Sequence, residues 1–188
     1  DGLYAGTTRG GLYRTFDGGT WEFAGTPLPG ADGRFTNWVR FVTEFRGALY
    51  AGIEGEGLFK SPDGLVWESV ALRPGTGVRA AAVIGEAFYV GTTSGGEVWR
   101  TADGERWERV FEAPALGGRR GYVASIAAAG GMIYAGIDGR VYRTAEGREW
   151  EEVGHLTPFT IEALHEFGGS LYAGTALPSR AWVYRARP

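Results

Sequence analysis

Three acidic residues in short polar segments, Glu54, Glu56 and Asp138, are the candidates for acid–base chemistry in this sequence. The reaction that such carboxylates suit best is glycoside hydrolysis, which needs two of them roughly 5–10 Å apart across a sugar-binding cleft. Each of the three falls in a segment with the composition of a hairpin turn. We therefore interpret them as solvated turn residues and keep hydrolysis as the alternative.

Cationic and aromatic side chains in or beside other expected loops are candidates for ligand binding, because a rigid scaffold presents its loops at the surface. The local cluster "GGRRG" is interpreted as a solvated loop or as a contact for an acidic partner or a glycan. Together with the three carboxylates, the predicted binding residues are Arg9, Arg34, Trp38, Arg119, Arg120, Tyr122 and Arg180.

The composition excludes several classes of function. The chain has no Cys and two His residues, so we expect neither a metal nor a cofactor. The formal net charge is −3 without a basic run, so we expect no nucleic-acid partner. No apolar run approaches the roughly 20 residues of a membrane-spanning helix. The scarcity of Asn, Gln, Met and Lys indicates either a thermophile protein or a GC-rich genome.

The elements that must position these residues repeat along the chain. A segment that reads Leu-Tyr-Ala-Gly or a close variant occurs five times, and its tyrosines are 46, 39, 45 and 38 residues apart: Tyr4, Tyr50, Tyr89, Tyr134 and Tyr172. A period near 42 matches the ~40–50 residues of a four-stranded propeller blade. We therefore predict an all-β propeller of about five four-stranded blades. It forms one domain over 1–188, with repeats at about 1–37, 38–78, 79–121, 122–159 and 160–188.

Alternation of apolar and polar residues predicts four strands in each complete repeat. The inner strand is expected at Trp38–Phe45, Arg79–Ile84, Tyr122–Ala128 and Thr160–Phe167. The Tyr-Ala-Gly segment is the second strand, and the fourth begins at a tryptophan. The pattern contains eighteen strands, because the first repeat lacks an inner strand and the last lacks an outer one. We expect residues outside this sequence, or another copy of the chain, to complete them.

The same tight turn joins the third and fourth strands of four repeats. An Asp at the start of a turn accepts backbone N–H groups two residues further on, and Gly supplies the positive φ that the turn requires. The tryptophan then packs its apolar face, so we expect it in the core. The eight residues interpreted as structural are Asp17, Trp21, Asp63, Trp67, Asp103, Trp107, Glu146 and Trp150.

With the Thr or Ser that precedes it, this turn resembles the Asp-box of the BNR, sialidase and sortilin-like propellers. The gap from Asp to Trp is one residue shorter than in the usual box, and the fourth copy has Glu146 in place of Asp. The resemblance implies that the boxes lie on one rim and that ligand groups come from the loops of the opposite face. Sialidase activity would require an Arg-Ile-Pro signature, which is absent.

These patterns predict a non-enzymatic, extracellular β-propeller that acts as a binding or structural module. Its expected partner is a protein or glycan ligand, and head-to-tail assembly with other copies of the chain is a further expectation. The alternative is a carbohydrate-binding or glycoside-hydrolase-like propeller that uses the loop face opposite the turns.

Overall fold

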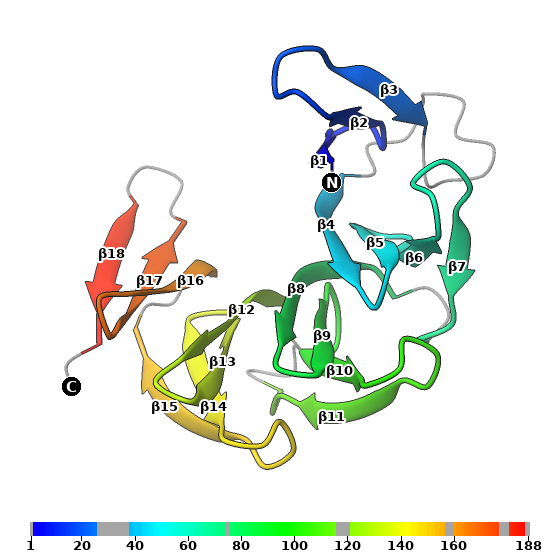
Figure 1. The fold of residues 1–188 in the computed structure, drawn as a ribbon. Helices are drawn as coiled ribbons and strands as arrows, with labels where there is room; N and C mark the ends of the chain where they lie inside the picture. The colour runs from blue at the N-terminus through cyan, green and yellow to red at the C-terminus, as the bar shows by residue number, and fades with distance from the viewer. Residues whose placement is uncertain are drawn as a thin grey trace. The chain divides into compact units, whose positions relative to one another are not determined.

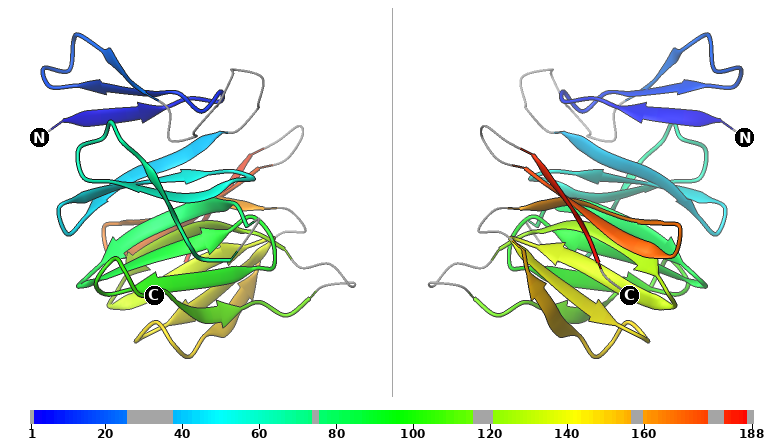
Figure 2. Two further views of the ribbon diagram at one scale, coloured as in Figure 1. Left: turned by 90° about the vertical axis from the view of Figure 1, so that its right-hand side faces the viewer. Right: turned by 90° about the vertical axis from the view of Figure 1, so that its left-hand side faces the viewer.

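The computed structural model describes residues 2–25, 38–73, 76–115, 121–156, 160–176 and 181–186. These residues form eighteen strands in five antiparallel sheets and no helix (Figure 1), and Figure 2 shows the same strands from two sides. The all-β prediction is confirmed. The described residues contain no helix that is long and apolar enough to cross a membrane.

The chain divides into two compact units, Asp1–Arg79 and Ala80–Pro188, and each is described by itself. The first unit contains sheet 1, with the order β1-β2-β3, and sheet 2, with the order β4-β5-β6-β7. Its strands are β1 (Leu3–Gly6), β2 (Leu12–Thr15), β3 (Glu22–Gly25), β4 (Val39–Phe45), β5 (Ala48–Ile53), β6 (Gly57–Ser61) and β7 (Glu68–Val70).

The second unit contains sheets 3 and 4, each of four strands in chain order, and sheet 5, with the order β16-β17-β18. Strand β8 begins two residues before the boundary of this unit. The strands are β8 (Val78–Ile84), β9 (Ala87–Thr92), β10 (Glu97–Thr101), β11 (Glu108–Glu112), β12 (Val123–Ala129), β13 (Met132–Ile137), β14 (Arg140–Thr144), β15 (Glu151–His155), β16 (Ile161–Phe167), β17 (Ser170–Thr175) and β18 (Trp182–Arg185). The single domain over 1–188 stays a prediction.

Two-residue turns join the first two strands of each four-stranded sheet and of sheet 5. Gly130 and Gly131 connect β12 to β13 with φ values of 56° and 75°. Positive φ at both positions is the requirement of a type I′ turn, whose twist matches that of antiparallel strands. The short segments between the first and second strands therefore form the tight hairpins that their sequences predict.

The Tyr-Ala-Gly segment also contacts the next sheet along the chain, as the first unit shows. A Cβ atom on Gly6 would overlap Val39, the first residue of β4, and the Val39 N–H donates to the carbonyl oxygen of Thr7 at 3.1 Å. The Tyr4 hydroxyl lies 2.6 Å from the position of a Cβ on Gly64, in the turn of sheet 2. Glycine at both sites therefore permits two sheets to pack closely.

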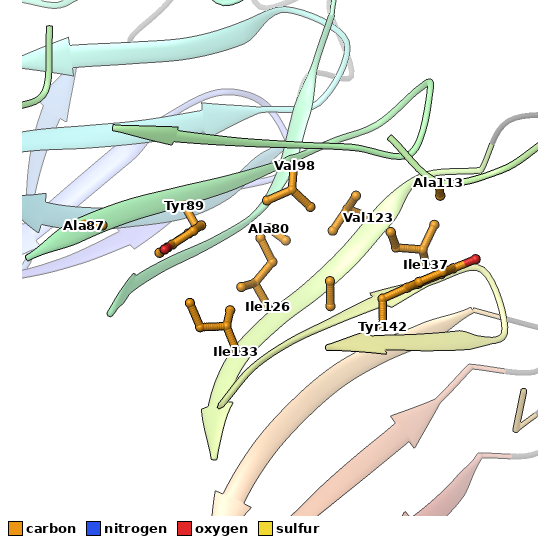
Figure 3. Close-up of a cluster of buried hydrophobic side chains, with 11 residues drawn as sticks. Ala80, Ala87, Tyr89, Val98, Ala113, Val123, Ile126, Ile133, Ile137 and Tyr142 are labelled. Carbon is orange, nitrogen blue, oxygen red and sulfur yellow. The ribbon is translucent and has the colours of Figure 1, made fainter. Parts of the chain in front are cut away.

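The core of the second unit lies between sheets 3 and 4. Figure 3 shows apolar side chains of these two sheets directed toward one another. All are at most 8% exposed, which is typical of the close-packed interior of a folded domain. The cluster includes Ala80, Ala87, Tyr89 and Val98 from sheet 3 and Val123, Ile126, Ile133, Ala135, Ile137 and Tyr142 from sheet 4.

Candidate functional site

Two of the predicted binding residues, Trp38 and Glu54, lie together at one end of sheet 2. The backbone N–H of Glu54 donates to the carbonyl oxygen of Trp38 at 3.0 Å. Strands β4 and β5 are antiparallel, with Val39 opposite Ile53. Because the residue before β4 must then lie beside the residue after β5, the pairing register alone brings Trp38 and Glu54 into contact.

Two arginines flank the Glu54 carboxylate, and the sequence patterns pointed to neither. Arg40, from β4, donates to Oε2 of Glu54. Nη1 of Arg79, at the start of β8, lies 3.5 Å from Oε1 of the same carboxylate. We call Trp38, Arg40, Glu54 and Arg79 the Trp38 cluster. The one sequence feature that could have indicated Arg40 is its position two residues after the tryptophan, in "WVR".

The indole ring of Trp38 packs against one of these arginines. Cζ of Arg40 is 4.2 Å from the ring centroid, within the range of a cation–π contact. Trp38 is nevertheless 41% exposed. The ion pair holds the guanidinium and the guanidinium supports the ring, so the cluster presents an aromatic surface to solvent in a fixed orientation.

Two guanidinium groups of the Trp38 cluster face one carboxylate. Guanidinium groups bind carboxylates in particular, so an acidic group on a ligand suits this cluster. Oε2 of Glu54 accepts a hydrogen bond from Arg40 and Oε1 forms an ion pair with Arg79, so both carboxylate oxygens face arginines. The described residues contain no group of three metal-ligating side chains. This arrangement suits binding better than acid–base chemistry.

Tyr122 and Asp138 occupy the corresponding positions at the end of sheet 4. The hydroxyl oxygens of Tyr122 and Thr160 are 2.5 Å apart, and the Asp138 carboxylate lies against Gly121. The carbonyl oxygen of Asp138 accepts the N–H of Ile161 at 2.9 Å. Both residues therefore connect sheet 4 to sheet 5, and a role for them in ligand binding stays a prediction.

The other predicted binding residues are not part of either group. Arg9 is exposed in the turn between β1 and β2. Glu56 lines a cavity of about 230 Å³ together with Arg73 and Thr76. The predictions that lie outside the described residues are Arg34, Arg119, Arg120 and Arg180.

The repeated turns contain the hydrogen bonds that their sequence predicts. In the third turn, Oδ1 of Asp103 accepts the N–H groups of Glu105 at 2.9 Å and Arg106 at 2.8 Å, and the Thr101 hydroxyl at 3.1 Å. The bonds from Arg106 and Glu105 lower the pKa of Asp103 to about 2, because they stabilise its ionised form. The same pattern, with a lowered carboxyl pKa, recurs at Asp17 and Asp63.

The fourth turn keeps half of this pattern. The N–H of Gly147 donates to the Thr144 hydroxyl at 3.1 Å, as in the other turns. Among the described residues, the Glu146 carboxylate accepts no N–H from the turn. Its longer side chain therefore does not substitute for Asp in closing this loop.

The expectation that the four turn tryptophans lie in the core is wrong. Trp21 is 42% exposed. The other turn tryptophans bury only part of the indole ring. The ring centroid of Trp107 lies 5.5 Å from that of Phe88 in an edge-on contact, and Trp150 stacks on Phe111 with a centroid distance of 5.3 Å. Each tryptophan precedes an outer strand, where one side of the ring remains near solvent. The half-buried rings are those of Trp67, Trp107 and Trp150.

A fully buried carboxylate, Glu97, lies at the start of β10. Trp99 Nε1 donates to its Oε2 at 3.1 Å, and Arg109 Nη1 lies 3.0 Å from its Oε1. A buried charge is tolerated when it is paired and hydrogen-bonded in this way. In the sequence Glu97 follows "SGG" and resembles a turn residue, so nothing local predicted its burial.

No model of a known protein family and no curated protein matches this chain. Solved structures do match it at low identity. An ancestral GH74 enzyme is 17% identical with a TM-score of 0.73 over 99% of this chain and 28% of its own. YCF48 bound to D1 peptide is 17% identical with a TM-score of 0.67 over 97% of this chain and 61% of its own. The extracellular domain of BT4673 from B. thetaiotaomicron is 16% identical, with a TM-score of 0.70. The match covers 93% of this chain and 25% of the BT4673 chain.

These similar structures are β-propeller-like proteins, so the chain has a β-propeller-like fold. At such identities the likeness extends to the fold alone. The chain spans about a quarter of the length of BT4673 and the GH74 enzyme and about three fifths of YCF48. The Asp-box family, the number of blades and the closure of a ring stay predictions.

Proposed function

We propose that this chain is a non-enzymatic binding module whose ligand contacts the Trp38 cluster. The observation that supports the proposal most directly is the exposed Trp38 ring, which Arg40 supports from one side at 4.2 Å. Exposed aromatic rings on rigid elements are typical anchors for ligands, because burying them on binding costs little conformational entropy.

The ligand that suits this cluster is a peptide segment with an acidic group. The guanidinium groups of the cluster suit a carboxylate on a ligand, and the indole offers an apolar contact beside them. Peptide recognition on a propeller-like fold has a parallel in YCF48 bound to D1 peptide. That likeness extends to the fold alone, so peptide binding by this chain is our inference.

The second candidate is a carbohydrate ligand, which the exposed indole of Trp38 also favours. A sugar ring stacks on an aromatic face without requiring an anion. Hydrolysis of that sugar has less support, since two arginines face the Glu54 carboxylate. Likeness to the GH74 enzyme does not change this, because it concerns the fold.

We further propose an extracellular location and contacts with other copies of the chain. The extracellular domain of BT4673 is one of the similar structures, which is compatible with such a location. Sheet 1 exposes large apolar side chains that a partner would cover: Leu3, Tyr13, Phe16, Trp21 and Phe23. Measurement of the sedimentation coefficient across concentrations tests the second proposal.

The binding proposal is tested with arrays of acidic peptides and of glycans, probed with the purified 188-residue chain. We expect selection of acidic peptides, with an affinity that falls as salt is added. Trp38→Ala should weaken binding at least ~10-fold, which corresponds to about 1.4 kcal/mol. Arg40→Gln should weaken it as well.

A matched control is available in the same unit. Phe16 is exposed and packs against Arg14, whose Cζ is 5.3 Å from the ring, but it lies at the repeated turn of sheet 1. Phe16→Ala should leave peptide binding unchanged. Glycan binding that depends on Trp38 without any peptide binding would favour the second candidate. Binding unaffected by Trp38→Ala would refute both.

A further inference from the structure

A cavity of about 230 Å³ lies at the same end of sheet 2 as the Trp38 cluster. Strands β4 to β7 of this sheet lie side by side in that order (Figure 1). Val39 is opposite Ile53 and Ile53 is opposite Gly57, so these three residues form a row across one end of the sheet. Trp38 directly precedes the first residue of the row, and Gly57 lines the cavity. Both belong to the first unit.

The turn between β5 and β6 connects the cluster to the cavity. The N–H of Glu56 donates to the carbonyl oxygen of Ile53 at 3.2 Å, which makes this turn tight. Glu54 in the turn belongs to the Trp38 cluster, whereas Glu56 lines the cavity. The cluster begins at β4 and the cavity lies at β6 and β7, two to three strands away. At the ordinary spacing of strands this separation is roughly 10–15 Å.

In sheets 3 and 4 the residue after the outer strand bonds back to the glycine before the third strand. The N–H of Ala113 donates to the carbonyl oxygen of Gly96 at 3.0 Å, and the N–H of Leu156 donates to that of Gly139 at 2.9 Å. The outer strands of these sheets, β11 and β15, have five residues each. In both sheets the chain therefore stays against the third strand where its outer strand ends.

Sheet 2 departs from this arrangement, and the departure opens the cavity. Its outer strand, β7, has three residues. Leu72 occupies the position of Ala113 and Leu156, but its N–H donates to the carbonyl oxygen of Val70 at 3.0 Å. The chain thus turns locally after β7, and the cavity lies between the start of β6 and the residues that follow this turn.

The cavity has apolar walls and a polar rim. Leu58 is fully buried, and Val70 and Leu72 are partly buried beside it. Glu56 and Arg73 are exposed lining residues of opposite charge. A cavity of about 150 Å³ with apolar walls holds a benzene molecule, so the cavity in sheet 2 has room for a leucine or phenylalanine side chain.

The contacts of Thr76 hold one wall of the cavity in place. Thr76 is 3% exposed, and its hydroxyl accepts a hydrogen bond from Nε of Arg73 at 2.9 Å. A Cβ atom on Gly57 would lie 3.6 Å from the carbonyl oxygen of Thr76, so this residue packs on the start of β6. Because the cavity is already formed, a ligand can fill it without the cost of rearranging the chain.

We propose that this cavity is a second subsite for the peptide that contacts the Trp38 cluster, and that it takes a leucine or phenylalanine side chain of that peptide. The inference rests on the binding function proposed for the cluster. An extended peptide advances about 3.3 Å per residue, so its acidic and apolar residues are roughly three to five positions apart. The cluster contacts the acidic residue, and the cavity selects the apolar residue at that spacing.

The test begins with an array of synthetic peptides, each with one central aspartate in a background of Gly and Ser, probed with the full 188-residue chain. Each peptide has Leu, Phe or Ala at one flanking position. We expect selection of Leu or Phe at roughly three to five positions from the aspartate. Fluorescence anisotropy then compares the selected leucine peptide with its Leu→Ala form. The alanine peptide should bind at least ~10-fold more weakly, because it buries less apolar surface.

Two protein variants separate the cavity from other surfaces. Ala71 is an exposed lining residue, so Ala71→Trp should obstruct the cavity. This variant should bind the leucine peptide as weakly as the alanine peptide, whose own affinity should not change. Leu65 is exposed in the repeated turn, at the other end of sheet 2, so Leu65→Trp should alter neither affinity. The melting temperature of each variant shows that it is folded.

The outcomes distinguish the subsite from the binding function itself. Binding that requires the Trp38 ring but shows no preference for Leu or Phe over Ala overturns the subsite and leaves the proposed function in place. Binding of the leucine peptide that Ala71→Trp does not weaken also overturns the subsite. If no peptide binds, or if Trp38→Ala has no effect on binding, the proposed function and the subsite are both wrong.

Discussion

The hydroxyl of Tyr89 in β9 rests on Gly147, the glycine of the turn in sheet 4, where a Cβ atom would overlap it. Nε of Arg100 donates to the same hydroxyl at 3.2 Å. The tyrosine of one sheet thus packs on the turn glycine of the next, as Tyr4 does on Gly64 in the first unit. This relation explains why the Tyr-Ala-Gly segment and the turn recur together along the chain.

Gly147→Ala is expected to destabilise the protein more than the same change in an open turn. The new methyl group meets a positive φ of 78° and the Tyr89 hydroxyl, so we expect a loss of roughly 2–4 kcal/mol. Gly18 has a φ of 75° and no neighbouring atom within 4 Å, so Gly18→Ala should lose about 1 kcal/mol. Urea unfolding measures both, and equal losses would contradict the packing role of Tyr89.

Acid should destabilise the protein through the turn carboxylates. The pKa values of Asp17 and Asp103 are about 2 in the folded chain, below the ordinary value of 3.8, because backbone N–H groups bond to the ionised carboxylates. A lowered folded pKa gives stability that is present above pH 4 and is lost as the pH falls toward 2. The urea midpoint should decline over that window. The decline should be shallower in Asp103→Asn, and an unchanged slope in that variant would contradict the role of this carboxylate.

The tryptophans of the turns should contribute unequally to stability. Trp150 is half-buried against Phe111, so Trp150→Ala should lower the free energy of unfolding by roughly 2–3 kcal/mol, less than for a fully buried ring. Trp21 is 42% exposed, so Trp21→Ala should cost about 1 kcal/mol. A larger loss for Trp21→Ala, measured by denaturant unfolding, would show that sheet 1 is covered in solution.

Removal of the Arg109 side chain, which pairs with Glu97, should lower the stability of the fold. Arg109→Met removes the ion pair between Arg109 and the buried Glu97 carboxylate, and we expect the free energy of unfolding to fall by roughly 2–4 kcal/mol. The double variant Arg109→Met/Glu97→Gln removes the charge and keeps an acceptor for Trp99 Nε1, so it should recover part of that loss. Thermal and urea unfolding of the two variants provide the comparison. No recovery in the double variant would argue against a charge penalty.

The strands and turns were predictable because they depend on neighbours close in sequence. The predicted strand Trp38–Phe45 differs from β4 by one residue, and Arg79–Ile84 differs from β8 by one. The bonds to Asp103 join residues at most three positions apart. Alternation and turn chemistry act over this range, so a single sequence contains the information.

The candidate site was predictable only in part. Glu54 was identified in an expected loop and Trp38 beside one, and the hairpin between them brings the two residues into contact. The contact of Arg79 with Glu54 was not predictable, since Arg79 belongs to the next sheet along the chain. Arg40 was placed in the expected strand, but no binding role was predicted for it. A side chain that reaches a site from a different sheet leaves no local pattern.

The sequence by itself determined the repeat, the eighteen strands and the hydrogen bonds of the first three turns. The tertiary structure alone decided which equivalent residues are buried. Val141 and Val183 occupy the same position of the same repeat, yet one is 5% and the other 75% exposed. Val141 is paired on both sides, with Gly136 of β13 and Gly154 of β15, whereas within the described residues Val183 is paired with Gly174 of β17. Burial depends on what packs against a residue, and the residue type and its position in the repeat do not specify those neighbours.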